Sequence, residues 1–388
     1  MNPLRSLNEH GQVVWLDFLS RRFIADGSLQ RLIDEDGLAG ATSNPSIFEK
    51  AIVGSRDYDA ELIAAGRVGN LDERALFERI AVEDIRNAAD VLRPVYNATR
   101  HRDGYISIEV SPYLAMRADA TVEEARRLWR SVDRDNLMIK VPATRPGLSA
   151  IRQLTGEGIN VNVTLLFSQK IYEGVVEAYL RGLEDLVARG GNPGRIASVA
   201  SFFVSRIDTA VDKLLDARID QTRDNAEHGA LTSIRGKVAI ANAKLAYQRY
   251  KRLFAGPRWE ALRAKGARTQ RLLWASTGTK NPEYSDVLYV EELIGPATIN
   301  TMPLATMDAF RDHGKIRASL EEDRPAARQV LKTLERLGIS LDEVTDKVLD
   351  DGVQLFADAM DKVFSAIAIK RASAATSGNA GPRHPARV

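Results

Sequence analysis

The chain has 388 residues, of which 44% are hydrophobic and 27% charged, as expected for a globular protein large enough to bury a substantial core. Its net charge of +2 gives no general attraction to nucleic acid or a membrane surface. The absence of cysteine excludes disulfides, thiolate catalysis and cysteine-based metal sites. No apolar run approaches the roughly 18 residues of a membrane span, and the first residues are not a signal-peptide core. We therefore expect a soluble, cytoplasmic protein.

Short apolar or β-branched runs alternate with longer helical patterns along the chain. This alternation is typical of βαβ units and a parallel sheet, and eight strands fit a closed (β/α)8 (TIM) barrel. A doubly wound open sheet is the alternative, but the Gly-rich first turn that usually marks it is missing. We expect one α/β barrel domain over residues 1–372, with strands at about 13–17, 38–43, 105–111, 137–142, 160–166, 196–203, 271–277 and 297–302.

A helical insertion is expected at about 207–268, between the sixth and seventh strands. Residues 235–271 hold eleven Lys or Arg and a single acid, Glu260, a local net charge of 11 − 1 = +10. A nucleic-acid patch is one interpretation, but the interspersed apolar residues favour a packed helix with a solvated basic face. A helical extension is expected from about 321 to 372, and residues 373–388, which are small and polar, are expected to be a disordered tail.

Lys140 is the most informative residue. It lies within Leu137-Met138-Ile139-Lys140-Val141-Pro142, an apolar run of the kind that is buried on both faces of a parallel sheet. Burial disfavours the charged form of an ammonium group, and a neutral lysine attacks carbonyls to give a Schiff base. A lysine that reaches solvent from a strand end is the alternative.

Polar residues recur within the other strands or where they end, which in barrel enzymes is where the active site lies. Taken singly, each has a structural explanation, such as a helix cap, a turn or an ion pair. Taken together they form a common rim, where buried polar groups need partners or a function. These residues are Asp17, Asn44, Glu109, Asn162, Thr164, Ser201, Arg206 and Ser276.

The types of residue on this rim suit carbon–carbon bond cleavage through a Schiff base. The lysine would turn a ketone into an electron sink, carboxylates would move protons, and amides and hydroxyls would hold a polyol. Arg206 and Lys280 are candidate ligands for a terminal phosphate. The five histidines are not at metal-ligand spacing, and there is no Gly-rich nucleotide motif, so we expect no metal and no cofactor.

Several segments resemble the transaldolases, Schiff-base enzymes of the pentose phosphate pathway with a (β/α)8 fold. They occur in the family's order along roughly residues 10–370, and together they are highly specific. The matching segments are Thr42-Ser43-Asn44-Pro45-Ser46, Ile108-Glu109-Val110-Ser111, Met138-Ile139-Lys140-Val141-Pro142-Ala143, Asn160-Val161-Asn162-Val163-Thr164-Leu165-Leu166-Phe167-Ser168 and Ser201-Phe202-Phe203-Val204-Ser205-Arg206.

The resemblance implies a role for each matching residue. Lys140 would form the Schiff base, and Asp17 would deprotonate the hydroxyl at the cleaved bond. Glu109 would transfer protons through a water that Thr164 also holds. Asn44 and Asn162 would bind the dihydroxyacetone part of the sugar phosphate, with Ser201 nearby, and Arg206 would bind the phosphate.

One segment departs from the shorter members of the family. Ser276-Thr277-Gly278-Thr279-Lys280-Asn281 replaces their Ser-Phe-Arg, which indicates the longer branch. Ser276 carries over, whereas Lys280 as the replacement phosphate ligand is a hypothesis. Two other functions stay open: an aldolase that releases free dihydroxyacetone, and an inactive barrel that only binds sugar phosphates. Phe203, where releasing relatives have a tyrosine, favours transfer.

Overall fold

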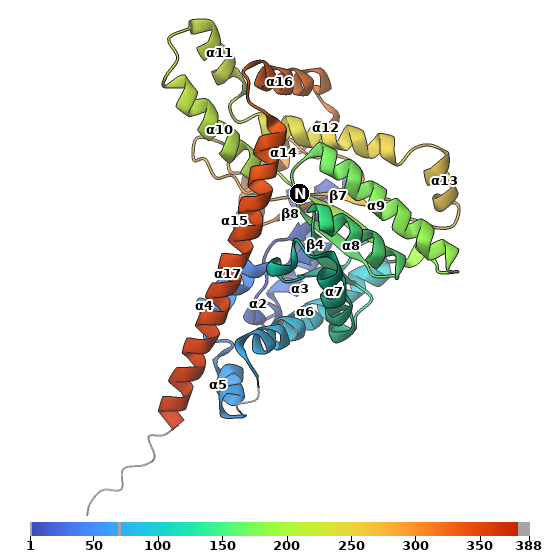
Figure 1. Cartoon of the computed structure of the whole chain (residues 1–388), viewed down its shortest axis with the longest axis vertical. Coiled ribbons are helices and arrows are strands. Elements are labelled where there is room, and N and C mark those ends of the chain that lie inside the picture. Colours follow the sequence, from blue (N-terminus) through green and yellow to red (C-terminus); the bar gives the residue numbers. More distant parts are fainter. Residues whose placement is uncertain (1, 69–70, 379–388) are drawn as a thin grey trace, which may run out of the picture.

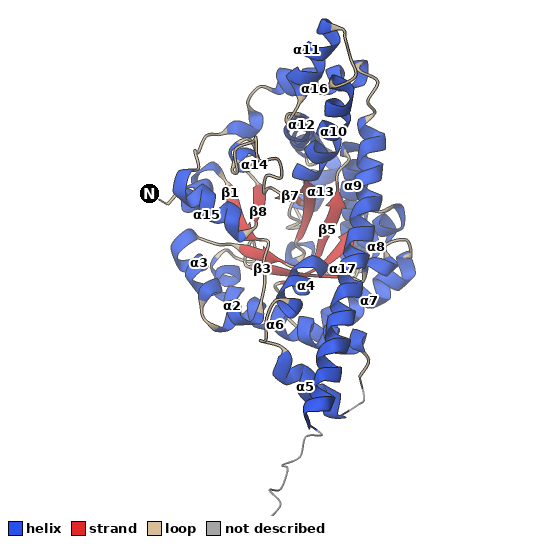
Figure 2. Ribbon diagram, turned by 90° about the vertical axis from the view of Figure 1, so that its left-hand side faces the viewer, coloured by secondary structure: helices blue, strands red, loops and turns tan. Residues whose placement is uncertain are grey.

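The computed structural model describes residues 2–68 and 71–378. Its centre is a closed barrel of eight parallel strands in sequence order, in which β8 pairs with β1 (Figure 2). The expected (β/α)8 barrel is confirmed, and every strand lies within three residues of its predicted bounds. The strands are β1 (Gln12–Leu16), β2 (Gly40–Thr42), β3 (Tyr105–Glu109), β4 (Leu137–Pro142), β5 (Val161–Leu166), β6 (Ser198–Phe203), β7 (Arg271–Ala275) and β8 (Thr298–Met302).

Burial on both faces explains why these strands appear in the sequence as continuous runs instead of alternating patterns. Every residue of β4, β5, β6, β7 and β8 is buried, because helices cover the outside and side chains fill the interior. Figure 2 shows the strands enclosed by helices. We call the end at which the strands finish the rim, and the opposite end the floor.

Helices follow the strands, and several begin on a polar residue just after a strand. Asn44, Thr144 and Ser168 each accept a backbone N–H bond as the N-cap of the next helix. The helices that precede β6 are α1 (Pro3–Ser6), η1 (Leu7–His10), α2 (Arg21–Ala25), α3 (Ser28–Asp36), α4 (Pro45–Val53), α5 (Asp59–Val68), α6 (Glu73–Ala98), η2 (Pro112–Leu114), α7 (Ala118–Val132), α8 (Arg145–Gly156), α9 (Gln169–Ala188) and η3 (Pro193–Arg195).

The stretch between β6 and β7 is helical, as the sequence predicts. It contains α10 (Ser205–Ile219), α11 (Asn225–Ile234), α12 (Val238–Leu253) and α13 (Pro257–Arg263). Helix α12 packs against α9 and against α16 (Arg324–Arg336). The remaining short elements are α14 (Leu288–Glu291), α15 (Leu304–His313) and η4 (Ser319–Glu321).

Helix α17 (Leu341–Gly378) runs along one side of the molecule (Figure 1). It packs against α4, α5, α6 and α10, which are far apart in sequence. The Ser340 hydroxyl accepts a hydrogen bond from the Glu343 N–H at 3.2 Å at the start of the helix. The helix continues past residue 372, where we expected the tail to begin, and residues 379–388 lie outside the described part. Among the described helices, none is long and apolar enough to cross a membrane.

Candidate active site

The strand register brings three predicted site residues to one level of the barrel. Glu109 on β3 pairs with Lys140 on β4, which pairs in turn with Asn162 on β5. The Lys140 Nζ lies 3.3 Å from the Glu109 carboxylate, and each side chain is only 4% exposed. Nζ also donates a 3.0 Å hydrogen bond to the Ser43 carbonyl at the end of β2. The lysine is thus buried and oriented, not extended to solvent.

The Glu109 carboxylate is buried and incompletely hydrogen-bonded. Burial raises the pKa of its carboxyl above the ordinary value, although the ammonium of Lys140 opposes the shift. Its Oε2 forms the ion pair with Lys140 Nζ at 3.3 Å but accepts no hydrogen bond among the described residues, and the buried Thr164 Oγ1 has no hydrogen-bond partner among them. Buried polar atoms of this kind call for a water or a substrate.

A cavity of about 310 Å³ opens at the rim above Lys140, and we call it the rim cavity. Ligand pockets commonly fall in the range of about 300–1,000 Å³. Glu109 and Asn162 are not among its lining residues and lie in the barrel wall. The predicted residues that line it are Asp17, Asn44, Lys140, Thr164, Ser201, Arg206, Ser276 and Lys280.

The comparisons with known proteins agree with this geometry. The sequence profile of the family described as transaldolase/fructose-6-phosphate aldolase matches residues 14–367. The chain belongs to this family. It is 47% identical over 370 residues to "Transaldolase 2" of Nostoc sp., covering 95% of this chain and 97% of that one. It is 46% identical over 380 residues to a transaldolase of Frankia alni, covering 97% of this chain and 100% of the relative. These full-length matches place it in the longer branch.

The two carboxylates of this transaldolase-family site lie in different surroundings. Asp17 follows β1, is partly exposed and accepts a 2.8 Å hydrogen bond from the Thr42 hydroxyl. Thr42 is also 3.1 Å from the Thr301 hydroxyl on β8. The threonine pair was not predicted, because hydroxyls within buried strands are common. Asp17 therefore reaches the rim cavity with a fixed orientation, whereas Glu109 is enclosed.

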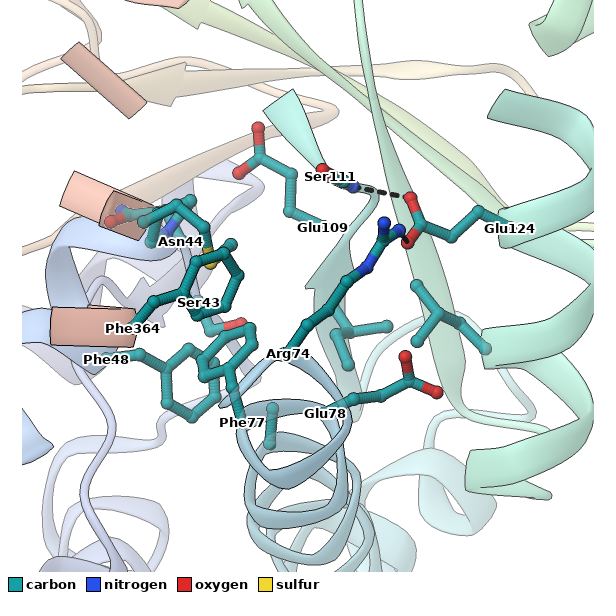
Figure 3. Close-up of a pocket in the computed structure, with 15 residues that line it drawn as sticks. Ser43, Asn44, Phe48, Arg74, Phe77, Glu78, Glu109, Ser111, Glu124 and Phe364 are labelled. Carbon is teal, nitrogen blue, oxygen red and sulfur yellow. Dashed lines mark hydrogen bonds and ion pairs between the residues drawn. The ribbon is translucent and has the colours of Figure 1, made fainter. Parts of the chain in front are cut away.

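Figure 3 shows Glu109 together with the aromatic and charged side chains that line a pocket beside it. A space of about 40 Å³ lies beside it, bordered by Phe48, Phe77 and Phe364. This volume is enough for a water molecule. On the polar side, the Glu124 carboxylate accepts a 2.7 Å bond from the Ser111 N–H and pairs with Arg74 at 3.0 Å. These contacts fix the segment that follows β3, and hence the backbone next to Glu109.

Asn162 is held by two hydroxyls. Its Nδ2 donates to the Ser107 Oγ at 2.9 Å, and its Oδ1 accepts from the Ser201 Oγ at 2.7 Å. Both bonds fix the amide, so Asn162 also positions Ser201 at the cavity. Asn44 differs, because its Oδ1 accepts from the Ile47 N–H as a helix cap and the amide nitrogen is left for a ligand.

Three cationic side chains line the rim cavity in addition to Lys140. Burial lowers the pKa of the Arg206 guanidinium, and its Nη1 has no hydrogen-bond partner among the described residues. The guanidinium lies over the rings of Phe203 at 5.3 Å and Phe356 of α17 at 5.7 Å. Lys280 and Lys50 complete the set. Sequence reasoning missed Lys50, because a lysine on a helix usually belongs to a solvated face.

The segment between β7 and α14, which carries Ser276 and Lys280, is anchored to α10. Ser276 has a positive φ of 57°, and its hydroxyl is 2.8 Å from that of Ser205. The Tyr284 hydroxyl donates to Asp212 at 2.8 Å. The Tyr289 hydroxyl donates to Asp208 at 3.0 Å.

Asp208 and Asp212 also bind the backbone near the start of α12. They accept from the N–H groups of Ala239, at 2.7 Å, and Gly236, at 3.0 Å. Burial raises the pKa of the Asp208 carboxyl to about 7, with a further contribution from Asp212. The two aspartates thus join α10, α12 and the segment that presents Lys280.

Proposed function

We propose that the chain is a transaldolase that moves a dihydroxyacetone unit as a covalent adduct of Lys140. The donor is sedoheptulose 7-phosphate or fructose 6-phosphate, and the acceptor is glyceraldehyde 3-phosphate or erythrose 4-phosphate. The observation that carries the proposal is the lysine itself. It is 4% exposed, lies 3.3 Å from a carboxylate of raised pKa and faces a cavity of about 310 Å³.

The first half of the reaction forms and uses the Schiff base. The neutral Lys140 amine adds to the ketose carbonyl, and loss of water from the carbinolamine leaves an iminium. Glu109, whose protonated form burial favours, donates the proton that the departing hydroxyl needs. Asp17 takes the proton from the hydroxyl at the breaking bond. The carbon–carbon bond then cleaves, the aldehyde departs, and the electron pair remains on Lys140 as an enamine.

The second half reverses these steps with a new aldehyde. The enamine carbon attacks the acceptor carbonyl, and Asp17 returns its proton to the new alkoxide. Water then hydrolyses the iminium and frees Lys140. The space of about 40 Å³ beside Glu109 and the unpartnered Thr164 hydroxyl support a role for a water in these proton transfers.

Substrate recognition follows from the rest of the lining. Asn44 and Ser201 hydrogen-bond the dihydroxyacetone part, with Asn162 behind Ser201. Arg206 binds the terminal phosphate together with Lys280, and Lys50 adds positive charge at the same cavity. Ser276, with its positive φ, sets the backbone course of the segment that leads from β7 to Lys280. The orphaned Nη1 of Arg206 supports this assignment, since a buried guanidinium donor lacks a partner until an anion arrives.

Transfer is favoured over release of free dihydroxyacetone. Phe203 lines the cavity, is 7% exposed and packs against Phe167 at 5.2 Å between ring centroids. An apolar ring there offers no hydroxyl to orient a water for premature hydrolysis of the adduct. We propose that the reaction takes place in the cytoplasm.

The test is a two-substrate assay with fructose 6-phosphate and erythrose 4-phosphate. We expect sedoheptulose 7-phosphate and glyceraldehyde 3-phosphate in equal amounts, with little free dihydroxyacetone. Free dihydroxyacetone formed as fast as the donor is consumed would replace the proposal with an aldolase. Donor binding without any product would leave only the inactive barrel. The Lys140→Met variant is the control for background chemistry.

A further inference from the structure

The basic stretch at 235–271 is almost entirely neutralised in the folded protein. Eight of its eleven cations lie within 4.0 Å of a carboxylate, most of them on other helices. An extended basic stripe for nucleic acid is therefore not formed. The pairs are Arg235–Asp216, Lys244–Glu292, Arg249–Glu173, Lys251–Glu321, Arg252–Glu173, Arg258–Glu184, Arg263–Glu260 and Arg271–Asp103.

Arg268 is an exception at the floor of the barrel. Its guanidinium donates to the backbone carbonyls of His101 and Arg100, the latter at 2.8 Å, and to no carboxylate among the described residues. Carbonyl oxygens satisfy the donors but do not neutralise the charge. The charge of Arg268 is therefore available to an anion.

The carbonyls that Arg268 binds belong to the turn between α6 and β3. Arg100 and His101 adopt positive φ values of 53° and 65°, which are uncommon for residues other than glycine. The turn exposes the side chains of Arg100 and Arg102, and within the described chain neither forms an ion pair. His101 stacks on Tyr96 with 4.3 Å between ring centroids. Two further uncompensated cations thus stand beside Arg268.

These groups surround a hollow of about 400 Å³, which we call the floor cavity. Arg271 lines it too and pairs with Asp103 at 2.7 Å, while Arg263 is at its edge and pairs with Glu260. Inside, the cavity reaches Met138 on β4 and Val199 on β6. These residues lie two positions before Lys140 and Ser201 on the same strands, so interior side chains separate the floor cavity from the rim cavity.

We propose that the floor cavity is a second anion-binding site, for a small phosphorylated compound such as a sugar phosphate or a diphosphate. Three uncompensated arginines, Arg100, Arg102 and Arg268, give it a local charge of +3, and none of the described residues that line it is a carboxylate. Its volume suits a compact ligand. Guanidinium groups favour phosphate because they donate paired hydrogen bonds. The neutralised surroundings favour this small ligand over a nucleic acid, which needs a continuous basic track.

The experiment is calorimetric titration with pyrophosphate at low ionic strength. The double variant Arg206→Ala/Lys280→Ala removes the proposed phosphate ligands of the rim, so that any remaining site can be assigned. We expect this variant to bind one pyrophosphate. Adding Arg100→Ala and Arg102→Ala should weaken that binding at least about tenfold, since each lost charge-assisted bond is worth a factor of roughly ten or more.

The control adds Arg130→Ala instead, a change to an exposed arginine of α7 that lies in no ion pair of the described residues and does not line the floor cavity. The proposal would be overturned if the control lost as much pyrophosphate affinity, or if the Arg206→Ala/Lys280→Ala variant bound no pyrophosphate. A single-stranded oligonucleotide that binds more tightly than pyrophosphate through the same arginines would also overturn it. Unchanged thermal unfolding midpoints would establish that the variants fold. Because the titration measures binding and not activity, its outcome does not depend on whether the chain is a transaldolase.

Discussion

The two ends of the barrel both attract anions but are built on different principles. At the rim, charges of both signs are buried together, with Lys140 and Glu109 each 4% exposed, and several polar atoms have no hydrogen-bond partner among the described residues. Among the described residues, the charged side chains that line the floor cavity are all cationic, and the guanidinium of Arg268 donates to backbone carbonyls. Buried groups of both signs with unused hydrogen-bonding atoms can transfer protons and react with a substrate. Exposed groups of one sign can bind an anion but do not supply such chemistry.

The difference follows from the direction of the strands. At the rim the strands end, and the helices that follow them begin with their N–H groups free. At the floor the helices end, and their free carbonyls attract guanidinium groups. After α6 the acceptors are carbonyls of the turn at residues 100–102, beyond the end of the helix, and they bind Arg268 and Arg271.

Replacing Lys140 gives the largest predicted effect and tests the rim directly. Lys140→Met removes the nucleophile but fills the same buried space, so we expect kcat/KM to fall about 10,000-fold or more. The far-ultraviolet circular dichroism spectrum should stay unchanged. Residual activity within about tenfold of the wild type would show that Lys140 is not the covalent residue.

Removing the buried guanidinium of Arg206 tests whether the rim arginine and the floor arginines differ in their effect on catalysis. Arg206→Ala should raise KM for fructose 6-phosphate about 10- to 100-fold, because charge-assisted bonds to phosphate are worth about 1.5–3 kcal/mol. The matched change at the floor, Arg100→Ala/Arg102→Ala, should alter steady-state kinetics by less than about twofold. Equal changes in KM for the two variants would show that the rim and floor arginines do not differ in their role in catalysis.

The stability of the rim side should depend on pH through Asp208. Burial raises the pKa of this carboxyl from 3.8 to about 7, so the folded state holds the proton more tightly than the unfolded state does. The stabilisation is complete below about pH 4 and is lost as the pH rises toward 7. Relative to Asp208→Asn, the wild type should lose up to about 1.4 kcal/mol of unfolding free energy per pH unit in this window.

Urea unfolding of both proteins from pH 4.5 to pH 8 measures this difference. The nearby Asp212 shifts in the same direction and is present in both proteins, so its contribution largely cancels. A difference in unfolding free energy that does not vary with pH would show that Asp208 ionises as freely in the folded chain as in the unfolded one.

Loosening the segment that carries Lys280 gives the smallest predicted effect. Tyr284→Phe removes the 2.8 Å bond to Asp212, worth about 1 kcal/mol. KM for fructose 6-phosphate should rise roughly two- to fivefold, while turnover of unphosphorylated fructose should not change. Tyr247→Phe, which loses a comparable 3.0 Å bond to the Pro296 carbonyl, is the control. A change of the same size with both sugars would mean that the loop does not act through the phosphate.

The barrel could be predicted from the sequence because its strands are buried on both faces. Such strands form compact apolar runs, and a polar residue within them is conspicuous, as Lys140 is in β4. Eight of the ten predicted site residues, Lys140 among them, line the rim cavity. Their chemical roles rest on the resemblance and stay predictions.

Contacts between distant segments were not predictable. Phe356 of α17 lies over Arg206, and Gly352 allows the close approach, since a Cβ there would be 3.2 Å from Nη1. Arg268 meets the turn at residue 100 across 168 residues of chain. The sequence showed the basic stretch but not the carboxylates on α9, α10 and η4 that neutralise it.

The most direct measurement is reduction with borohydride in the presence of fructose 6-phosphate, followed by mass spectrometry of the digested protein. We predict a reduced dihydroxyacetone adduct on Lys140 and none on Lys50 or Lys280, which line the same cavity but are not enclosed with Glu109. An adduct on another lysine, or none on a protein shown to be folded, would contradict the central claim that the buried Lys140 is the covalent residue.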